Sequence, residues 1–314
     1  MHRIAIIGLG MALKPHALAL RDLAGRVEVA AAWSRGAERR ARAEAEWGFR
    51  ATGDLDAILS DDRIDAAMIL APPWAHGEIA LRCAAAGKHV LLEKPPAGTL
   101  GEAEALARLA AREGRVLFAT WHSHYNTAVE AARRFLADKA PDTLRVDWNE
   151  DFRAFHPDQD WIWQADGLGV FDMAINALSV ISRIFADPPF VRDAELRIAA
   201  NHVAPIAAVV RFGVAGESGP LEMHTNWGHA GPDQRELRVA TRCGHRLELL
   251  DSGGTLTIDG AVAVQEERAE YRMLYERFAA LLCEGRSDID LAPLRMTLDA
   301  LAVGRRVALP RFEG

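Results

Sequence analysis

The chain has 314 residues, which is long for a single hydrophobic core, so we expect two domains. Apolar residues make up 50% and charged residues 26% of the chain, as in soluble globular proteins. A formal net charge of -7 argues against a nucleic-acid-binding surface, and no apolar run approaches the roughly 20 residues of a membrane span. The cysteines, Cys83, Cys243 and Cys283, lack the spacing of a zinc site or a disulfide framework, which suits a reducing cytoplasm.

Residues 1–121 are predicted to form an α/β domain, a Rossmann-type doubly wound parallel sheet. Short β-like segments at 3–7, 27–33, 65–70, 89–93 and 115–121 alternate with helical segments at 11–24, 37–47, 75–87 and 99–114. Strands that alternate with helices favour a parallel sheet with right-handed crossovers. The last of these helices begins with a capping box, Thr99 to Glu102, and is expected to stop at Gly114.

The turn after the first strand, in "IAIIGLGMAL", carries two glycines of a dinucleotide-binding motif. Gly8 permits a tight turn, and Gly10 lets the backbone approach a pyrophosphate at a helix N-terminus. The third small residue of GxGxxG would be position 13, which is Leu13, although Ala12 serves if the turn is one residue shorter. We predict cofactor contacts at Gly8, Gly10, Met11 and Ala12.

Directly after the second strand, where an acidic residue would bind the ribose 2′-hydroxyl of NAD, the stretch "WSRGAERR" has Ser34 and Arg35 instead. Ser34 and Arg35 offer a hydroxyl and a guanidinium instead, which fit the 2′-phosphate of NADP. The alternative is a solvated basic helix start, because Arg39 and Arg40 alternate with glutamates. We predict NADP as the cofactor, with NAD left open.

Two further strands end in segments that the fold would place near a ligand, since ligands of open parallel sheets bind outside the strands' carboxyl ends. The segments are "APPWAH" and "EKPP", with the candidate cofactor-binding residues Ala71, Pro72, Pro73, His76, Glu93 and Lys94. The prolines restrict the residues that precede them, which would fix the direction of Lys94. Without the other sequence signals of a dinucleotide-binding domain, Lys94 would be interpreted as an ordinary surface lysine before a turn.

Residues 122–314 are predicted to form a second, α+β domain for substrate binding and oligomerisation. Helical segments at 127–139, 167–185 and 292–306 accompany β-like runs at 144–152, 194–199, 206–212, 221–227, 236–242, 246–250 and 255–259. Strands that follow one another without helices favour a large, mostly antiparallel open sheet. Thr127 and Glu130 predict a capping box for the first helix. The exposed face of such a sheet predicts a homodimer or a higher homo-oligomer.

The helix at 167–185 has an apolar stripe and a polar pair. The stripe consists of Phe171, Ile175, Leu178, Ile181 and Phe185. Asp172 and Asn176 are four residues apart and therefore share a face, which is either a site or an ordinary polar outer face. In "LRVDWNEDF", Glu150 takes an apolar position in the alternation, so it has a partner or a cleft, or the strand already ends in solvent. His122 and His124 form H-x-H with no further ligand pattern, so no metal site is predicted.

These motifs together resemble the glucose–fructose oxidoreductase / inositol dehydrogenase / MocA family. GLG, APPxxH, EKP and the helix "GVFDMAINALSV" with "FHPDQDWIW" before it carry the resemblance, which covers nearly the whole chain. Such proteins place the EKP lysine at the nicotinamide with a helix of the second domain against it. Many members carry D-x-x-x-H, whose histidine is taken as the base, but Asn176 cannot accept a proton here. The Asn variant is similar to the subgroup of bacterial L-arabinose and D-galactose 1-dehydrogenases.

The resemblance implies an NAD(P)-dependent oxidation of C1 of an aldose pyranose to its lactone. Lys94, Asp172 and Asn176 would be catalytic, with either Asp172 or Lys94 as the proton acceptor. The implied sugar-binding set is Lys94, His122, Glu150, His156, Asp172 and Asn176, with Trp163 or Trp227 stacked on the ring. The alternatives are a dehydrogenase of inositol or of another sugar position, and a dinucleotide-binding protein without turnover.

Overall fold

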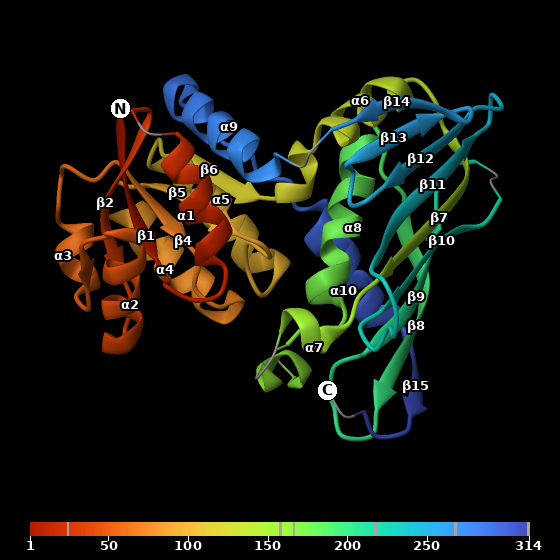
Figure 1. Ribbon diagram of the computed structural model, residues 1–314, viewed down its shortest axis with the longest axis horizontal. Coiled ribbons are helices and arrows are strands. Elements are labelled where there is room, and N and C mark those ends of the chain that lie inside the picture. The colour runs from red at the N-terminus through yellow and green to blue at the C-terminus, as the bar shows by residue number, and fades with distance from the viewer. Residues whose placement is uncertain (24, 157–158, 166, 217–218, 267–268, 313–314) are drawn as a thin grey trace. The chain divides into compact units, whose positions relative to one another are not determined.

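The computed structural model describes residues 1–23, 25–156, 159–165, 167–216, 219–266 and 269–312, and divides the chain into two compact units (Figure 1). Unit 1 comprises Met1–His122 and Glu270–Leu291, and unit 2 comprises Ser123–Ala269 and Ala292–Gly314. The division differs from the predicted boundary because helix α9 (Glu270–Glu284) returns to unit 1. Phe278 of α9 is fully buried there and stacks on Phe118, with ring centroids 5.8 Å apart.

Unit 1 is built on a six-stranded, wholly parallel sheet in the order β3-β2-β1-β4-β5-β6. Its strands are β1 (His2–Ile7), β2 (Val27–Trp33), β3 (Ala51–Thr52), β4 (Ala66–Ile69), β5 (His89–Glu93) and β6 (Leu117–Thr120). Its other helices are α1 (Leu13–Asp22), α2 (Ala37–Trp47), α3 (Leu55–Leu59), α4 (Pro73–Ala85) and α5 (Leu100–Arg112). This confirms the predicted doubly wound sheet and adds β3 and α3, which are too short to show a periodic pattern.

The strands of unit 1 are apolar on both faces because helices cover the sheet on both sides. In Figure 1, α1 and α9 lie side by side, and α4 lies next to α5. The predicted capping box of α5 is confirmed in its first half, since Thr99 Oγ1 accepts a hydrogen bond of 3.2 Å from the Glu102 amide. The Glu102 carboxylate accepts from the Gly98 amide instead of the Thr99 amide.

Unit 2 contains a nine-stranded sheet in the order β14-β13-β12-β11-β7-β10-β9-β8-β15. The strands are β7 (Pro141–Asn149), β8 (Phe190–Ala199), β9 (Ala207–Gly213), β10 (Leu221–Asn226), β11 (Gln234–Thr241), β12 (Arg246–Leu250), β13 (Thr255–Ile258), β14 (Ala261–Gln265) and β15 (Arg305–Leu309). The pairs β7–β10 and β8–β15 are parallel and the others are antiparallel. The predicted mostly antiparallel sheet is therefore confirmed.

Helices cover one face of this sheet (Figure 1). They are α6 (Thr127–Leu136), α8 (Phe171–Ile184) and α10 (Ala292–Val303), and the short elements η1 (His122–Tyr125), α7 (Phe152–Phe155) and η2 (Asp160–Trp163) lie in the connections. The predicted apolar stripe of α8 is confirmed, because all five of its residues are buried. The capping box predicted at Thr127 is wrong: the N-cap position of α6 is Asn126, whose side chain makes no capping hydrogen bond, and the Glu130 carboxylate accepts from Arg133 and Arg183.

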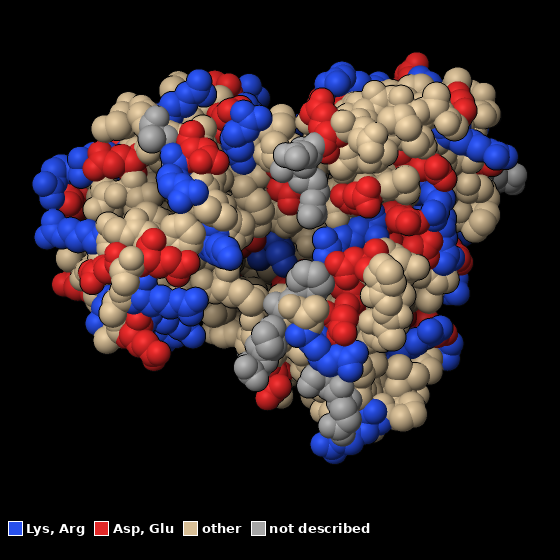
Figure 2. All heavy atoms as spheres, in the orientation of Figure 1, with Lys and Arg blue, Asp and Glu red and all other residues tan. Residues whose placement is uncertain are grey.

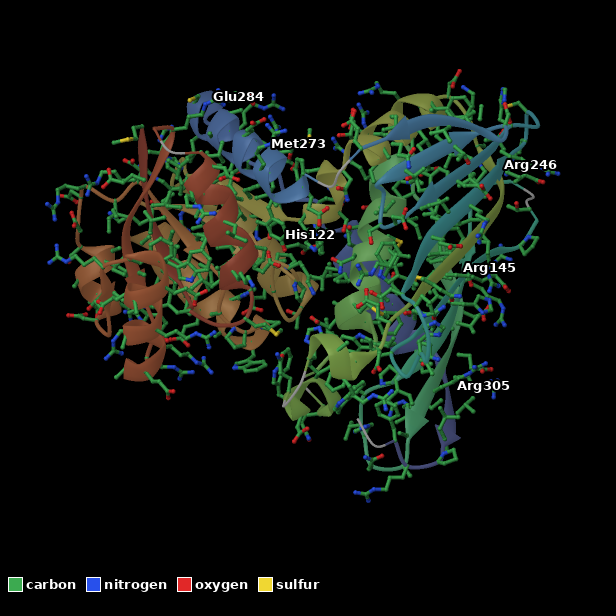
Figure 3. All side chains as sticks on the ribbon, in the orientation of Figure 1. His122, Arg145, Arg246, Met273, Glu284 and Arg305 are labelled. Carbon is green, nitrogen blue, oxygen red and sulfur yellow. The ribbon has the colours of Figure 1, made fainter. Side chains whose placement is uncertain are left out.

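The other face of the sheet is open and charged. Arg145 donates to Asp147 at 2.5 Å, and Arg211 pairs with Asp193 and Glu222. Figure 3 shows Arg145 and Arg305 pointing away from α8 and α10, and Figure 2 shows acidic and basic side chains interspersed over this unit. Alternating charges keep a broad uncovered sheet soluble. Within the described part of the chain, no helix has the length and apolar character that would let it cross a membrane.

Candidate active site

The glycine turn after β1 has the geometry of a phosphate-binding turn. Gly8 has φ +107°, and a Cβ there would lie 2.6 Å from the carbonyl carbon of Leu70 and from the amide nitrogen of Ala71. A Cβ on Gly10, in contrast, would meet no atom within 4 Å. Helix α1 begins at Leu13 with Ala12 as its N-cap, so its first amide groups follow the open space at Gly10. These residues fit a bound pyrophosphate, and Met11 beside them is 54% exposed.

At the end of β2, an arginine that the sequence reading placed on a solvated helix face supports the predicted 2′-phosphate site. Arg40 Nη1 donates to the carbonyl oxygens of Ser34 at 2.7 Å and of Arg35 at 2.8 Å. Ser34 is buried, whereas the side chain of Arg35 is exposed and can reach a ligand. Arg40 thus holds the backbone of Ser34 and Arg35 in place. The sequence signal for this role of Arg40 was its position in the first turns of α2, shortly after the Gly36 N-cap.

His76 corrects a predicted cofactor contact. Its side chain is fully buried, with Nε2 2.5 Å from the Ala71 carbonyl oxygen and Nδ1 2.9 Å from that of Pro95. Burial lowers the pKa of His76, although the two carbonyl oxygens favour the protonated form. Both nitrogens are occupied, so the prediction that this side chain binds the cofactor is wrong. His76 instead joins the Ala71–Pro72–Pro73 segment to the segment after Lys94.

Glu93 ends β5 as a buried carboxylate with partners in unit 1 that the sequence did not predict. Thr120 Oγ1 donates a hydrogen bond to Glu93, and His16 Nε2 lies 3.4 Å from Glu93 Oε2. Burial by itself would raise the pKa of Glu93, but the contact with His16, the charge of His122 and the Thr120 hydroxyl lower it to about 2. Glu93 is therefore an anion at neutral pH. Lys94 follows it directly and is half-buried.

In unit 2, the polar pair Asp172 and Asn176 lies on the largely buried helix α8. Asp172 lies in the first turn and is 8% exposed, and Asn176 is half-buried one turn later. An acidic side chain is favourable at this end of a helix because the macrodipole is positive there. A carboxylate and an amide are costly to bury unless they have polar partners. The alternative of a solvated outer face is therefore wrong for Asp172.

Glu150 has the partner that its position required. It is 7% exposed, and Arg235 Nε of β11 donates to its Oε1 at 2.6 Å. Arg235 also donates to Asp233 Oδ2 at 3.0 Å. The alternative of a strand end in solvent is therefore wrong. Arg235 is a site neighbour that sequence reasoning missed, because it lies far along the chain on a strand paired with β7.

The two candidate stacking tryptophans belong to the interior of unit 2. Trp227 is 0% exposed and Trp163 is 3% exposed. One face of Trp163 stacks on His202, with centroids 4.6 Å apart, and the edge of Trp227 packs against Phe152 and His156. Neither ring has an exposed face for a sugar, so the prediction that Trp163 or Trp227 stacks on the substrate is wrong. His156 is half-buried at the rim of this aromatic cluster and remains a candidate.

His122 lies in unit 1 near α9 (Figure 3), with its ring stacked on Tyr271 and Nδ1 3.6 Å from Glu270 Oε1. Among the residues that the structure describes, no group of three His, Cys, Asp or Glu side chains is arranged to hold a metal ion. Unit 1 thus brings together the glycine turn, Ser34, Arg35, Glu93 and Lys94, along with His122. Unit 2 carries the second set of candidates, namely Glu150, His156, Asp172 and Asn176.

Comparisons with known proteins agree with this arrangement. The family described as an oxidoreductase family with an NAD-binding Rossmann fold, GFO/IDH/MocA, matches residues 2–121. Galactose 1-dehydrogenase from Pseudomonas fluorescens is 37% identical over 267 residues, which are 84% of this chain and 84% of that protein. The chain belongs to this oxidoreductase family. The resemblance drawn from GLG, APPxxH and EKP is thereby confirmed.

Two solved structures share the fold over nearly the whole chain. The crystal structure of a D-galactose-1-dehydrogenase protein from Rhizobium etli is 39% identical, with a TM-score of 0.90 over 99% of this chain and 97% of that one. A 3-ketoreductase from Actinomadura kijaniata, solved with NADP and TDP-benzene, has a TM-score of 0.85 over 98% and 99% of the two chains. At 19% identity, the latter shows the fold alone.

Proposed function

We propose that the protein is an NADP-dependent aldose 1-dehydrogenase that oxidises C1 of a pyranose, such as D-galactose or L-arabinose, to the lactone. The observation that carries the proposal is the polar pair of α8, with Asp172 buried and Asn176 half-buried, in a chain 37% identical to a galactose 1-dehydrogenase over 84% of its length. The open space at Gly10 and the EKP lysine supply the cofactor side of such a site. Chains of this family without turnover would be expected to lack Lys94 or Asp172, and this one has both.

The reaction removes a proton from the C1 hydroxyl and a hydride from C1, and leaves a C1=O bond. The nicotinamide cofactor, when bound, supplies the hydride acceptor. Asp172 accepts the hydroxyl proton, and Lys94 donates a hydrogen bond to the same oxygen; the reverse assignment remains open. Asn176 orients that oxygen, since an amide donates and accepts but cannot act as a base. The remaining hydroxyls are bound by His122, Glu150 and His156.

Substrate class is tested by a spectrophotometric screen of aldoses and inositols with NADP and NAD, followed by identification of the product. We expect aldoses that share the galactose configuration at most ring carbons to be oxidised, with the lactone as product. Oxidation of inositol alone would support the alternative sugar or inositol dehydrogenase. Turnover of none of these compounds, combined with tight NADPH binding, would support the dinucleotide-binding protein without turnover.

Cofactor preference is expected to depend on Arg35. The Arg35→Ala variant should raise KM for NADP about tenfold or more, because hydrogen bonds to a charged phosphate contribute roughly 1.5–3 kcal/mol, and should leave KM for NAD unchanged. Arg42→Ala is the matched control, because Arg42 is an exposed residue of α2 that pairs with Glu46. Steady-state kinetics with both cofactors check the prediction. A strong preference of the unmodified protein for NAD would contradict it.

The charged open face of the unit 2 sheet suits a second copy of this chain. Its arginines and carboxylates alternate, so the same surface on two copies offers opposite charges to each other. We expect a homodimer whose dissociation constant rises with salt. Analytical ultracentrifugation at low and high ionic strength measures it, with Arg145→Glu as the variant that introduces like charges. A monomer at micromolar concentration and low salt would contradict the assignment.

A further inference from the structure

Unit 1 contains a buried polar cluster next to Lys94 that the proposed reaction does not use. It joins α1, three neighbouring strands and α9 through His16, Met68, Glu93, Thr120, Tyr271 and Tyr275. His16 and Tyr275 are both 0% exposed. Polar groups are retained in a core at a cost, so a cluster of this size at the end of β5 calls for a role.

The two ring nitrogens of His16 face two different groups. Nε2 lies 3.4 Å from Glu93 Oε2, which is an ion-pair distance, and Nδ1 lies 2.6 Å from Tyr275 Oη. The Tyr275 hydroxyl donates its only hydrogen to Met68 Sδ, so it can only accept from His16. Both ring nitrogens of His16 therefore face acceptors. This arrangement is satisfied when both nitrogens carry a hydrogen and the imidazole is a cation.

The charges around His16 support the same conclusion. Glu93 is an anion in a buried position, and a buried carboxylate needs a cation nearby. Tyr271 and Tyr275, which pack against His16 from α9, stay neutral because burial and the charge of Glu93 raise their pKa values well above 10. Two further imidazoles interact with Glu93: His122 already faces the carboxylate of Glu270, and both nitrogens of the buried His76 face backbone carbonyl oxygens. His16 is thus the direct partner of Glu93.

We propose that His16 is a positioning residue for Lys94, acting through Glu93 as the cation of a buried ion pair. Glu93 and Lys94 are consecutive residues at the carboxyl end of β5, so whatever holds the Glu93 side chain also holds the backbone from which Lys94 extends. In this ion pair, the positive charge of His16 also compensates the negative charge of Glu93 next to the Lys94 amine. The inference rests on the role proposed above for Lys94 in sugar oxidation.

Loss of the cation should be visible in the pH dependence of catalysis. In His16→Gln, Glu93 is left as an uncompensated anion beside Lys94, which disfavours loss of a proton from the reacting groups. We expect the acid limb of the kcat/KM profile to move up by about one pH unit, the effect of one charge at a few ångströms, with about a tenfold loss on that limb. Glu93→Gln and the double variant, in which neither charge of the pair remains, should both leave the acid limb close to that of the unmodified protein.

Two conservative variants separate positioning from folding. Tyr275→Phe removes the acceptor of His16 Nδ1 and keeps the ring, so it should shift the acid limb in the same direction by a smaller amount. Tyr271→Phe is the matched control, because the rings of Tyr271 and His16 pack edge to face with centroids 4.9 Å apart, and no hydrogen bond between the Tyr271 hydroxyl and His16 occurs in the described structure. It should leave the profile unchanged. An unchanged profile in both His16→Gln and Tyr275→Phe would overturn the proposal.

A measurement without turnover tests the ion pair itself. The ¹⁵N chemical shifts of the His16 imidazole, assigned by comparison with His16→Gln, should be those of a doubly protonated ring at pH 7 and become those of a neutral ring in Glu93→Gln. A neutral ring at pH 7 in the unmodified protein would overturn the proposal even if sugars are oxidised. If no sugar is oxidised but the ring is doubly protonated, the proposed function fails while the ion pair stands.

Discussion

Replacing Lys94 by alanine is expected to lower kcat by about 10²- to 10⁴-fold, the range of general acid–base effects. The variant removes the donor that holds the C1 oxygen during proton loss, whereas cofactor binding relies largely on the glycine turn and on Arg35. The KM for NADP should therefore change little. Stopped-flow or steady-state kinetics on the best aldose of the screen measure both constants. A kcat within a factor of about two of the unmodified protein would contradict the assignment.

The Asp172→Asn variant should lower kcat by a similar factor. Its pH profile also shows which group accepts the proton. Asparagine keeps the shape and hydrogen-bonding capacity of the side chain but cannot accept a proton. If Asp172 is the acceptor, the acid limb of the kcat profile disappears in Asp172→Asn and persists in Lys94→Ala. If Lys94 is the acceptor, the acid limb persists in Asp172→Asn and disappears in Lys94→Ala. Asp187→Asn is the matched control, because Asp187 is exposed just after the same helix.

Gly8→Ala is expected to destabilise unit 1 strongly. The added Cβ would lie 2.6 Å from two backbone atoms, at Leu70 and Ala71, and φ at Gly8 is +107°, which an L side chain rarely adopts. Because neither neighbour is the end of a flexible side chain, the strands β1 and β4 must separate locally. We expect a loss of about 3 kcal/mol or more in the free energy of unfolding, from strain and displaced packing together. Urea unfolding monitored by circular dichroism measures it.

Gly10→Ala is the matched variant for this prediction. Its Cβ meets no protein atom within 4 Å, so the unfolding free energy should change by less than about 0.5 kcal/mol. If Gly10 admits the backbone to the pyrophosphate, the Kd for NADPH, measured by fluorescence titration, should rise about tenfold or more. Equal stability of Gly8→Ala and Gly10→Ala would contradict the close approach of Gly8 to β4. Unchanged NADPH affinity in Gly10→Ala would contradict the pyrophosphate site.

Much of the fold could be predicted from local sequence because its signals are local. The alternation of apolar runs with helical periods predicted the parallel sheet, and the spacing of Phe171, Ile175 and Leu178 predicted the buried face of α8. The glycine turn and EKP were likewise visible, since a turn or a strand end is formed by consecutive residues. The Thr127 capping box shows the limit of such signals, because a neighbouring residue, Asn126, took the cap position.

The partners of the buried site residues could not be predicted, because they come from distant parts of the chain. Nothing near Glu150 points to Arg235, and nothing near Glu93 points to His16 or to the tyrosines of α9. Burial of Trp163 and Trp227 was also hidden, since an aromatic residue in a connection is compatible with a ligand site and with a core. The same holds for His76, whose nitrogens are taken by two carbonyl oxygens of different segments.

By itself, then, the sequence determined the two kinds of sheet, the family, and the position of the lysine, the acid and the amide along their elements. Periodicity and turn chemistry act over a few residues and can be read in order. Only the tertiary structure decided that α9 returns to unit 1, that Glu93 and Glu150 are buried beside His16 and Arg235, and that the two tryptophans pack inside unit 2. Those outcomes depend on which distant side chains satisfy one another's charge, hydrogen bonds and volume once the chain is packed.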